Sequence, residues 1–251
     1  MIGIIYKRVL NIFKTIPVKL WGLSLLSGLL SVIVLIFGLT PIISIPVIAV
    51  ISAGMSAIYL SAYNGRDVSS NQMFDGFRDF WHVAGGMCWQ YLWLFLWFLI
   101  PIAGPVIAIV KSISYSFTPY ILMQEKSVTA IDAIKKSKQD TMGHKGKIFA
   151  AIYVPAIAFV LLSVVLALLA LIPFVGILFA IISFIVSLIY SLFAPMFLEL
   201  VQAGFYEYIK TPASSSAKVD KKAPKAPCPS CGHENAVGLK FCGKCGTKIS
   251  D

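Results

Sequence analysis

The stretch IFAAIYVPAIAFVLLSVVLALLALI (residues 148–172) is followed, after one proline, by FVGILFAIISFIVSLIYSLFAPMFL (residues 174–198), and neither half contains a charged residue. A bilayer core about 30 Å thick needs about 20 apolar residues in a helix, so each half is long enough to cross it. Pro173 and Gly176 stand at the turn, where they break the helix and let the chain reverse. The stretch therefore predicts a transmembrane hairpin, with arms from about Lys147 to Ile172 and from Phe174 to about Leu198.

The same pattern occurs twice more along the chain. One hairpin is expected from Val18–Gly38 with a return from 41 to 63, and another from 82 to 100 with a return from 105 to 124. The composition agrees, because the chain is 58% hydrophobic and only 13% charged, whereas soluble domains carry about 25% charged residues. We expect an all-α polytopic membrane protein with about six transmembrane helices in three hairpins, forming a transmembrane domain over residues 1–209.

The positive charges fix the expected topology. Lysine and arginine fall before residue 20, in 64–81, in 125–147 and in the tail, with Lys111 as the exception. By the positive-inside rule, both termini lie in the cytosol and the protein is multi-pass in the plasma membrane. A five-span alternative would export the lysine-rich loop at 125–147, which the same rule opposes. The N-terminal stretch is too mixed in charge to predict a cleaved secretory signal.

Two cytosolic stretches have helical patterns of their own. Residues 2–15 place their apolar side chains near one face, which fits either a helix in the headgroup layer or simply the start of the first span. Residues 66–81 predict an interfacial helix capped by Ser69 or Ser70. Its aromatic face, expected at the bilayer boundary, would comprise Met73, Phe74, Phe77, Phe80 and Trp81.

Residues 127–141 predict a third cytosolic helix, with Ser127 as its N-cap. A short apolar stripe on one side is matched by Lys135, Lys136 and Lys138 on the water-facing side. Lysines near anionic headgroups favour a connector at the membrane surface. The alternative interpretation is a helix that docks a partner.

Lys111 is the sharpest anomaly in the membrane domain, because it lies about six residues inside the fourth span. A lysine at depth is costly unless its ammonium reaches the interface or finds a partner. One interpretation is therefore snorkelling. The other is a cationic membrane site formed by Lys111, Ser114 and Tyr115, and it motivates an alternative function as a transporter or sensor of a small molecule or peptide.

The C-terminal tail contains two Cys-x-x-Cys-Gly motifs, with cysteines at Cys228, Cys231, Cys242 and Cys245. Four thiolates on two such turns match the closed tetrahedral shell of one structural zinc ion, and iron is the alternative metal. Thiolate ligands need a reducing compartment, which again indicates the cytosol. We expect a zinc-ribbon domain at 227–251 behind a disordered Pro/Ser/Lys linker at 210–226.

Short motifs between residues 94 and 149 also carry a family resemblance. They are Leu96-Trp97, Ile100-Pro101, Lys111, Ser114-Tyr115-Ser116, Pro119-Tyr120-Ile121-Leu122, Ala130-Ile131, Ser137-Lys138 and Gly143-His144-Lys145, with Phe74-Asp75-Gly76-Phe77 upstream. Together they resemble the bacterial integral membrane family called domain of unknown function 975. The resemblance covers most of residues 1–209 and implies a multi-span membrane protein, but it brings no established activity and no catalytic residues.

The tail resembles the short zinc ribbon appended to many bacterial membrane proteins. The resemblance rests on Cys-Pro-x-Cys-Gly, Asn235 and Phe-Cys-x-x-Cys-Gly, and it places the zinc ligands on the same four cysteines.

The predicted function is that of a membrane protein presenting a cytosolic zinc-binding ribbon, as a scaffold or regulatory module for protein–protein interaction. The expected partners are the lipid bilayer and a cytosolic or membrane protein. Nucleic acid is disfavoured, because only Phe241 could stack on a base and the positive charge is diluted. An enzyme is not expected, since the sequence has no phosphate-binding glycine loop, no nucleophile elbow and no His-Glu-x-x-His motif.

Overall fold

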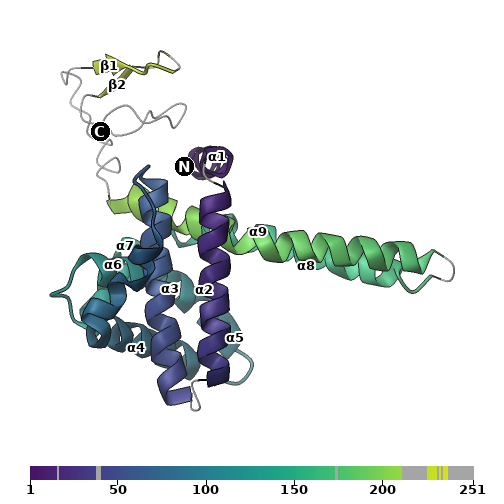
Figure 1. Ribbon diagram of the computed structural model, residues 1–251, viewed down its shortest axis with the longest axis horizontal. Coiled ribbons are helices and arrows are strands. Elements are labelled where there is room, and N and C mark those ends of the chain that lie inside the picture. The colour runs from purple at the N-terminus through teal and green to yellow at the C-terminus, as the bar shows by residue number, and fades with distance from the viewer. Residues whose placement is uncertain are drawn as a thin grey trace.

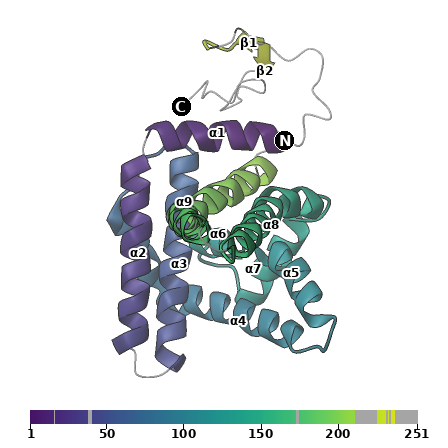
Figure 2. The same ribbon diagram turned by 90° about the vertical axis from the view of Figure 1, so that its right-hand side faces the viewer.

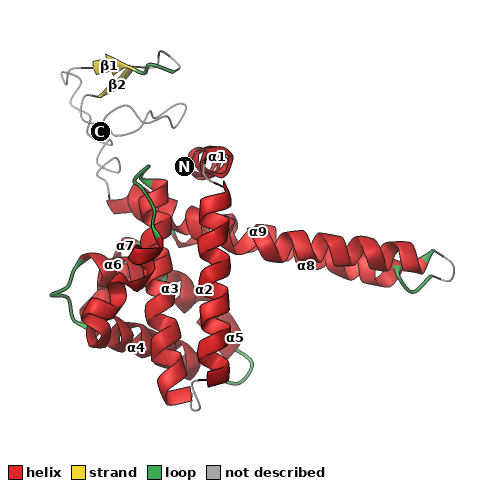
Figure 3. Ribbon diagram, in the orientation of Figure 1, coloured by secondary structure: helices red, strands yellow, loops and turns green. Residues whose placement is uncertain are grey.

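Most of the chain forms helices in the computed structural model, which describes residues 1–15, 17–37, 41–172, 175–210, 225–230, 232 and 234–236 (Figures 1 and 3). Five segments are long and apolar enough to cross a membrane. The predicted all-helical class with several long apolar helices is therefore confirmed. The helices are α1 (Ile2–Thr15), α2 (Pro17–Phe37), α3 (Pro41–Tyr63), η1 (Ser70–Asp79), α4 (Phe80–Phe98), α5 (Gly104–Tyr115), α6 (Thr118–Gln124), α7 (Ala130–Asp140), α8 (Lys145–Leu169) and α9 (Gly176–Lys210).

Two of the three predicted hairpins form as expected. α2 and α3 match the first hairpin closely, and α8 with α9 forms the third. α9 continues past the expected end near Leu198 to Lys210. Figures 1 and 2 show that the α8–α9 hairpin projects from the rest of the molecule, crosswise to the direction of α2 and α3. A membrane-spanning helix usually tilts by no more than about 40° from the bilayer normal, so in this arrangement only one of the two hairpins lies upright in a flat bilayer.

The middle hairpin departs from a simple pair of spans. α4 has 19 residues, but it is not among the five segments that qualify by hydropathy. Its His82, its Gln90 and its tryptophans lower its hydropathy. The predicted fourth span is also broken into α5 and α6, because Pro119 lacks an N–H and clashes with the carbonyl four residues earlier. The count of six spans stays a prediction, and α4 is the helix that decides it.

α3 forms the centre of the packed body, against α2, η1, α4, α6 and α9. Its Gly54 admits η1 at backbone contact, since a Cβ there would lie 2.1 Å from the carbonyl oxygen of Met73. Met73 is consequently buried, which corrects its predicted place on the bilayer-facing aromatic face. η1 is a 3₁₀-helix that leads directly into α4, and Ser69 holds its N-cap position without a side-chain cap bond.

Helix α1 is a separate helix whose apolar face packs on protein, with Ile5 and Val9 fully buried. Its Tyr6 hydroxyl donates to the carbonyl of Ala151 in α8 at 2.6 Å. Its Arg8 guanidinium donates to the carbonyl of Tyr63 and lies 4.1 Å from that ring's centroid. Burial lowers the pKa of Arg8 to about 10. The N-terminal helix therefore bonds to both α3 and α8. Neither role expected for residues 2–15, a helix in the headgroup layer or the start of the first span, includes these contacts.

Helix α7 begins later than expected. Its N-cap is Thr129, whose hydroxyl oxygen accepts from the Asp132 amide at 3.2 Å, so the prediction of Ser127 was wrong. The extended backbone of Thr129 places that hydroxyl over the first turn. The buried face of α7 includes Ala133 and the polar Ser137.

Candidate functional site

The first cysteine turn of the tail lies partly within the described residues. Strand β1 (Lys225–Pro227) pairs antiparallel with β2 (Glu234–Ala236), and Cys228 follows β1 directly with only 3% of its surface exposed. The Gly232 amide donates to the Cys228 carbonyl at 2.8 Å. The φ angle of Gly232 is +68°, a left-handed conformation that glycine adopts at little cost. This turn accounts for the glycine that follows the second cysteine in the sequence.

The other predicted ligands, Cys231, Cys242 and Cys245, lie outside the described residues, as do most of the predicted ribbon and the linker. Among the residues that are described, no group of three or more His, Cys, Asp or Glu side chains is placed to hold a metal ion. The zinc ion, its four ligands and the domain boundary near 227 therefore stay predictions.

The polar membrane site was predicted from Lys111, Ser114 and Tyr115. All three lie on α5, but each side chain has different surroundings. The Lys111 ammonium lies 4.6 Å from the centroid of the Trp97 ring in α4, a cation–π contact. The Ser114 hydroxyl donates to Val110 of its own helix at 2.9 Å, and Tyr115 is buried. Lys111 also lies within electrostatic reach of Lys138 and Lys145. Both lysines belong to the connector predicted to be cytosolic, and α5 packs against α7 and α8, the helices that carry them.

The break between α5 and α6 exposes backbone groups that two other helices satisfy. The Ser137 hydroxyl of α7 donates to the Ser114 carbonyl at 2.9 Å and accepts from the Phe117 amide at 3.1 Å. The Gln202 side chain of α9 donates to the Ser116 carbonyl at 2.7 Å. Buried backbone groups are costly when unpaired, so these contacts make the break a stable part of the fold. In the sequence, Ser137 and Gln202 looked like ordinary polar surface residues, and only Pro119 signalled the break.

A carboxyl group is also buried where several helices meet. The Oε2 atom of Glu199 in α9 has no solvent contact and no hydrogen-bond partner in the described part of the chain. The carboxyl lies within electrostatic range of the hydroxyl groups of Tyr59 in α3, Tyr91 in α4 and Tyr120 in α6. The Tyr120 hydroxyl is buried, near Ser56 but without a well-formed bond. In the sequence, the signal for this buried group is Glu199 itself, an acidic residue inside the long apolar helix α9.

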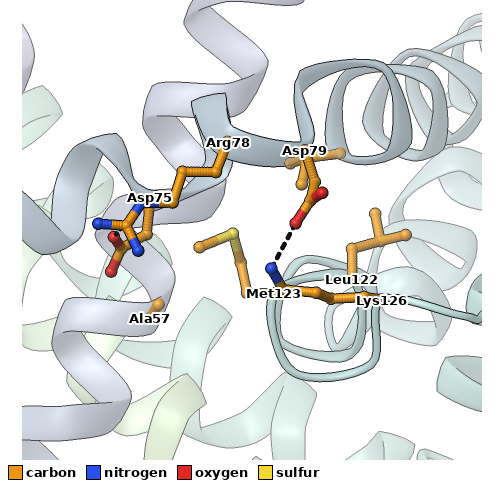
Figure 4. Close-up of a pocket in the computed structure, with 9 residues that line it drawn as sticks. Ala57, Asp75, Arg78, Asp79, Leu122, Met123 and Lys126 are labelled. Carbon is orange, nitrogen blue, oxygen red and sulfur yellow. Dashed lines mark ion pairs between the residues drawn. The ribbon is translucent and has the colours of Figure 1, made fainter.

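A pocket of about 280 Å³ lies where η1, the start of α4, α3 and the end of α6 meet (Figure 4). Apolar side chains from α3, α4 and α6 form part of its wall, and charged side chains from η1 and the loop after α6 form the rest. Gly76 allows η1 to pack closely against Val50 of α3, because a Cβ at this position would lie 2.9 Å from a methyl carbon of Val50. The lining residues are Ala57, Asp75, Gly76, Arg78, Asp79, Val83, Leu122, Met123 and Lys126.

Two ion pairs flank this pocket, with the Met123 side chain between them in Figure 4. The Lys126 ammonium lies 2.6 Å from Asp79 Oδ2, and the Arg78 guanidinium lies 3.7 Å from Asp75 Oδ1. The hydrogen bond from Lys126 holds the pKa of the Asp79 carboxyl below its usual range. No sequence pattern predicted this pocket, although the Phe74-Asp75-Gly76-Phe77 motif contributes two of its lining residues, Asp75 and Gly76.

The loop beside the pocket is tied to the end of the membrane domain. Glu125 pairs with Lys136 of α7 at 2.5 Å and with Lys210 of α9 at 3.8 Å. Lys210 also donates to Gln124 at 2.5 Å. These bonds join the end of α6 to the last residue of α9, where the predicted linker begins.

Comparison of the chain with models of protein families, with curated proteins and with solved structures gave no match. The resemblance of residues 1–209 to the family of unknown function and of the tail to appended zinc ribbons therefore stays a prediction. The functional argument rests on the chain's own residues.

Proposed function

We propose that this chain is a multi-pass plasma-membrane protein that presents a zinc-binding ribbon to a partner protein, as a scaffold or regulatory module. Both termini lie in the cytosol, and the apolar helices anchor the ribbon to the bilayer. The observation that carries the proposal is the turn at Cys228–Gly232, where a short strand delivers a buried cysteine and a left-handed glycine closes the turn. That geometry suits a metal-binding cysteine turn.

The composition of the tail supports a role in binding rather than catalysis. A domain of this size depends on its metal ion to fold, and four thiolates close the coordination shell, so the zinc has no open position for a substrate. Residues 210–251 hold eight lysines and three acids. With a zinc–tetrathiolate centre of charge −2, a modest positive charge remains, which favours an acidic partner surface.

The test compares wild-type protein with the Cys228→Ser/Cys231→Ser variant in native membranes. We expect one zinc per wild-type chain and a partner, recovered by crosslinking and pull-down, that the variant loses while it stays inserted and folded. Cys88→Ser is the matched control, and it should keep both the zinc and the partner. An unchanged partner set in the double variant would refute the recruiting role of the ribbon, and iron in the purified protein would refute zinc.

A further inference from the structure

The pocket between η1 and α6 presents balanced charge on an apolar wall. Asp75 and Asp79 supply two negative charges, while Arg78 and Lys126 supply two positive charges. The four charged side chains are between 39% and 79% exposed, so ligand groups can reach them, but a ligand of a single charge could pair with only one member of each ion pair. A ligand carrying one positive and one negative group could instead exchange partners with an existing pair and leave every charge matched.

We propose that this pocket binds a small zwitterion, in which a primary ammonium is joined by a short spacer to a phosphate or carboxylate. The ammonium would lie against Asp79 or Asp75, and the anionic group would lie against Lys126 or Arg78. This site is separate from the ribbon, and the proposal does not depend on the proposed function of the tail.

The lining residues favour a primary ammonium over a quaternary one. Quaternary ammonium groups are recognised by cages of aromatic rings, and none of the nine lining residues is aromatic. Carboxylates instead accept hydrogen bonds, which a primary ammonium donates and a quaternary one cannot. On the anionic side, the guanidinium of Arg78 and the ammonium of Lys126 are the usual partners of phosphate and carboxylate groups.

The size and the walls of the pocket limit the ligand further. Its volume of about 280 Å³ is at the lower end of small-molecule sites, which span roughly 300–1,000 Å³. A headgroup-sized molecule fits such a volume. Leu122 and Met123 belong to α6 and Ala57 to α3, and both helices lie in segments apolar enough to span a membrane. The same chemistry could therefore come from a lipid headgroup or from a free metabolite.

The experiment uses the purified full-length protein in detergent and measures binding by titration calorimetry. The probes are dihexanoyl phosphatidylethanolamine, the phosphatidylcholine and phosphatidylglycerol with the same chains, and free glycerophosphoethanolamine, which keeps the phosphodiester and has no net charge. We expect phosphatidylethanolamine to bind at least about tenfold more tightly than either other lipid, because only it combines a hydrogen-bonding ammonium with an anion. Equal binding of free glycerophosphoethanolamine would assign a soluble ligand, and preference for the lipid would assign a headgroup; both support the zwitterion site.

Two variants locate the site. Asp79→Asn/Lys126→Gln removes one ion pair, and Ala57→Leu fills the pocket without changing its charge. Each should weaken phosphatidylethanolamine binding at least about tenfold. Asp132→Asn/Lys135→Gln, which removes an exposed pair on α7, is the matched control and should bind normally. Equal binding of the three lipids by wild-type protein, or normal binding by Ala57→Leu, would overturn the proposal.

Discussion

Helices α3 and α8 are both long and apolar, yet α3 is largely buried inside the protein and α8 is largely exposed. In their most apolar windows, 56% of α3 is buried inside the protein and 0% of α8 is. α3 packs against helices on several sides, whereas α8 packs mainly along α9 and projects with it from the body (Figures 1 and 2). Apolar composition therefore does not by itself distinguish a helix that faces protein from one that faces lipid.

Side-chain size explains the difference. α3 carries Ala49, Ala53 and Gly54 on buried positions, and small residues let neighbouring backbones approach closely. The second half of α8 instead exposes Val160, Leu161 and Val164. Large apolar side chains thus cover this face of α8, which suits lipid tails. Substituting one residue in the packed region and a matching residue on an exposed helix therefore compares the two environments directly.

The largest effect is expected at Gly54. Gly54→Ala would drive a Cβ to 2.1 Å from the Met73 carbonyl oxygen, which displaces η1 from α3 and destabilises the fold by about 3 kcal/mol. The control is Gly28→Ala in α2, where a Cβ meets no atom within 4 Å and alanine favours the helix. Thermal unfolding of both variants in one detergent would measure the difference. Equal stability of the two variants would contradict the close packing of η1.

A smaller loss is expected at Ser137. Ser137→Ala leaves the Phe117 amide without its partner and the Ser114 carbonyl with only the bond of 3.5 Å from the Thr141 hydroxyl, at a cost of about 2 kcal/mol. Ser163→Ala is the control, because its hydroxyl bonds only to Phe159 within α8, and it should change stability by less than about 0.5 kcal/mol. If Ser163→Ala proved as damaging as Ser137→Ala, the break between α5 and α6 would not depend on α7.

The smallest effect concerns the exposed pair of Asp79 and Lys126. Because the folded-state pKa of Asp79 lies below its unfolded value of 3.8, the ionised carboxylate stabilises the fold above that pH, and the benefit is lost as pH falls through the folded pKa. Asp79→Asn should lower the melting temperature slightly at pH 7. The gap from wild type should narrow as the pH falls below 3.8. A gap that widens on acidification would contradict the pairing.

The helical segments could be predicted from the sequence because they depend on local signals. Apolar length, tip prolines and the positions of lysine predicted α2, α3 and α8 to within a few residues, whereas α9 continues twelve residues past its expected end near Leu198. The cap of α7 was missed because Ser127 and Thr129 are equally good cap residues, and only the backbone conformation selects between them. A helix was predicted over residues 66–81, but the packing of η1 against α3 was not, because it depends on Gly54, which lies in another helix.

The candidate sites divide in the same way. Cysteine spacing identified Cys228 and its turn from local pattern alone. The pocket lined by Asp79 and Lys126 could not be predicted, because its lining residues come from three separate stretches of the chain that only the tertiary fold brings together. Lys111 was recognised as anomalous, but its contact with Trp97 depends on how α4 and α5 pack against each other.

The central claim is that the tail forms a zinc ribbon in the cytosol. Measuring on which side of the membrane the tail lies tests this claim most directly. In a Cys88→Ser background, an impermeant thiol reagent would be applied to intact cells, to broken membranes and to broken membranes with a zinc chelator. Ala103→Cys, in the tip predicted to lie outside, serves as the accessible control. The account predicts labelling of Ala103→Cys in intact cells, with the tail cysteines labelled only after breakage and more strongly after chelation. Labelling of the tail cysteines in intact cells would contradict a cytosolic zinc ribbon.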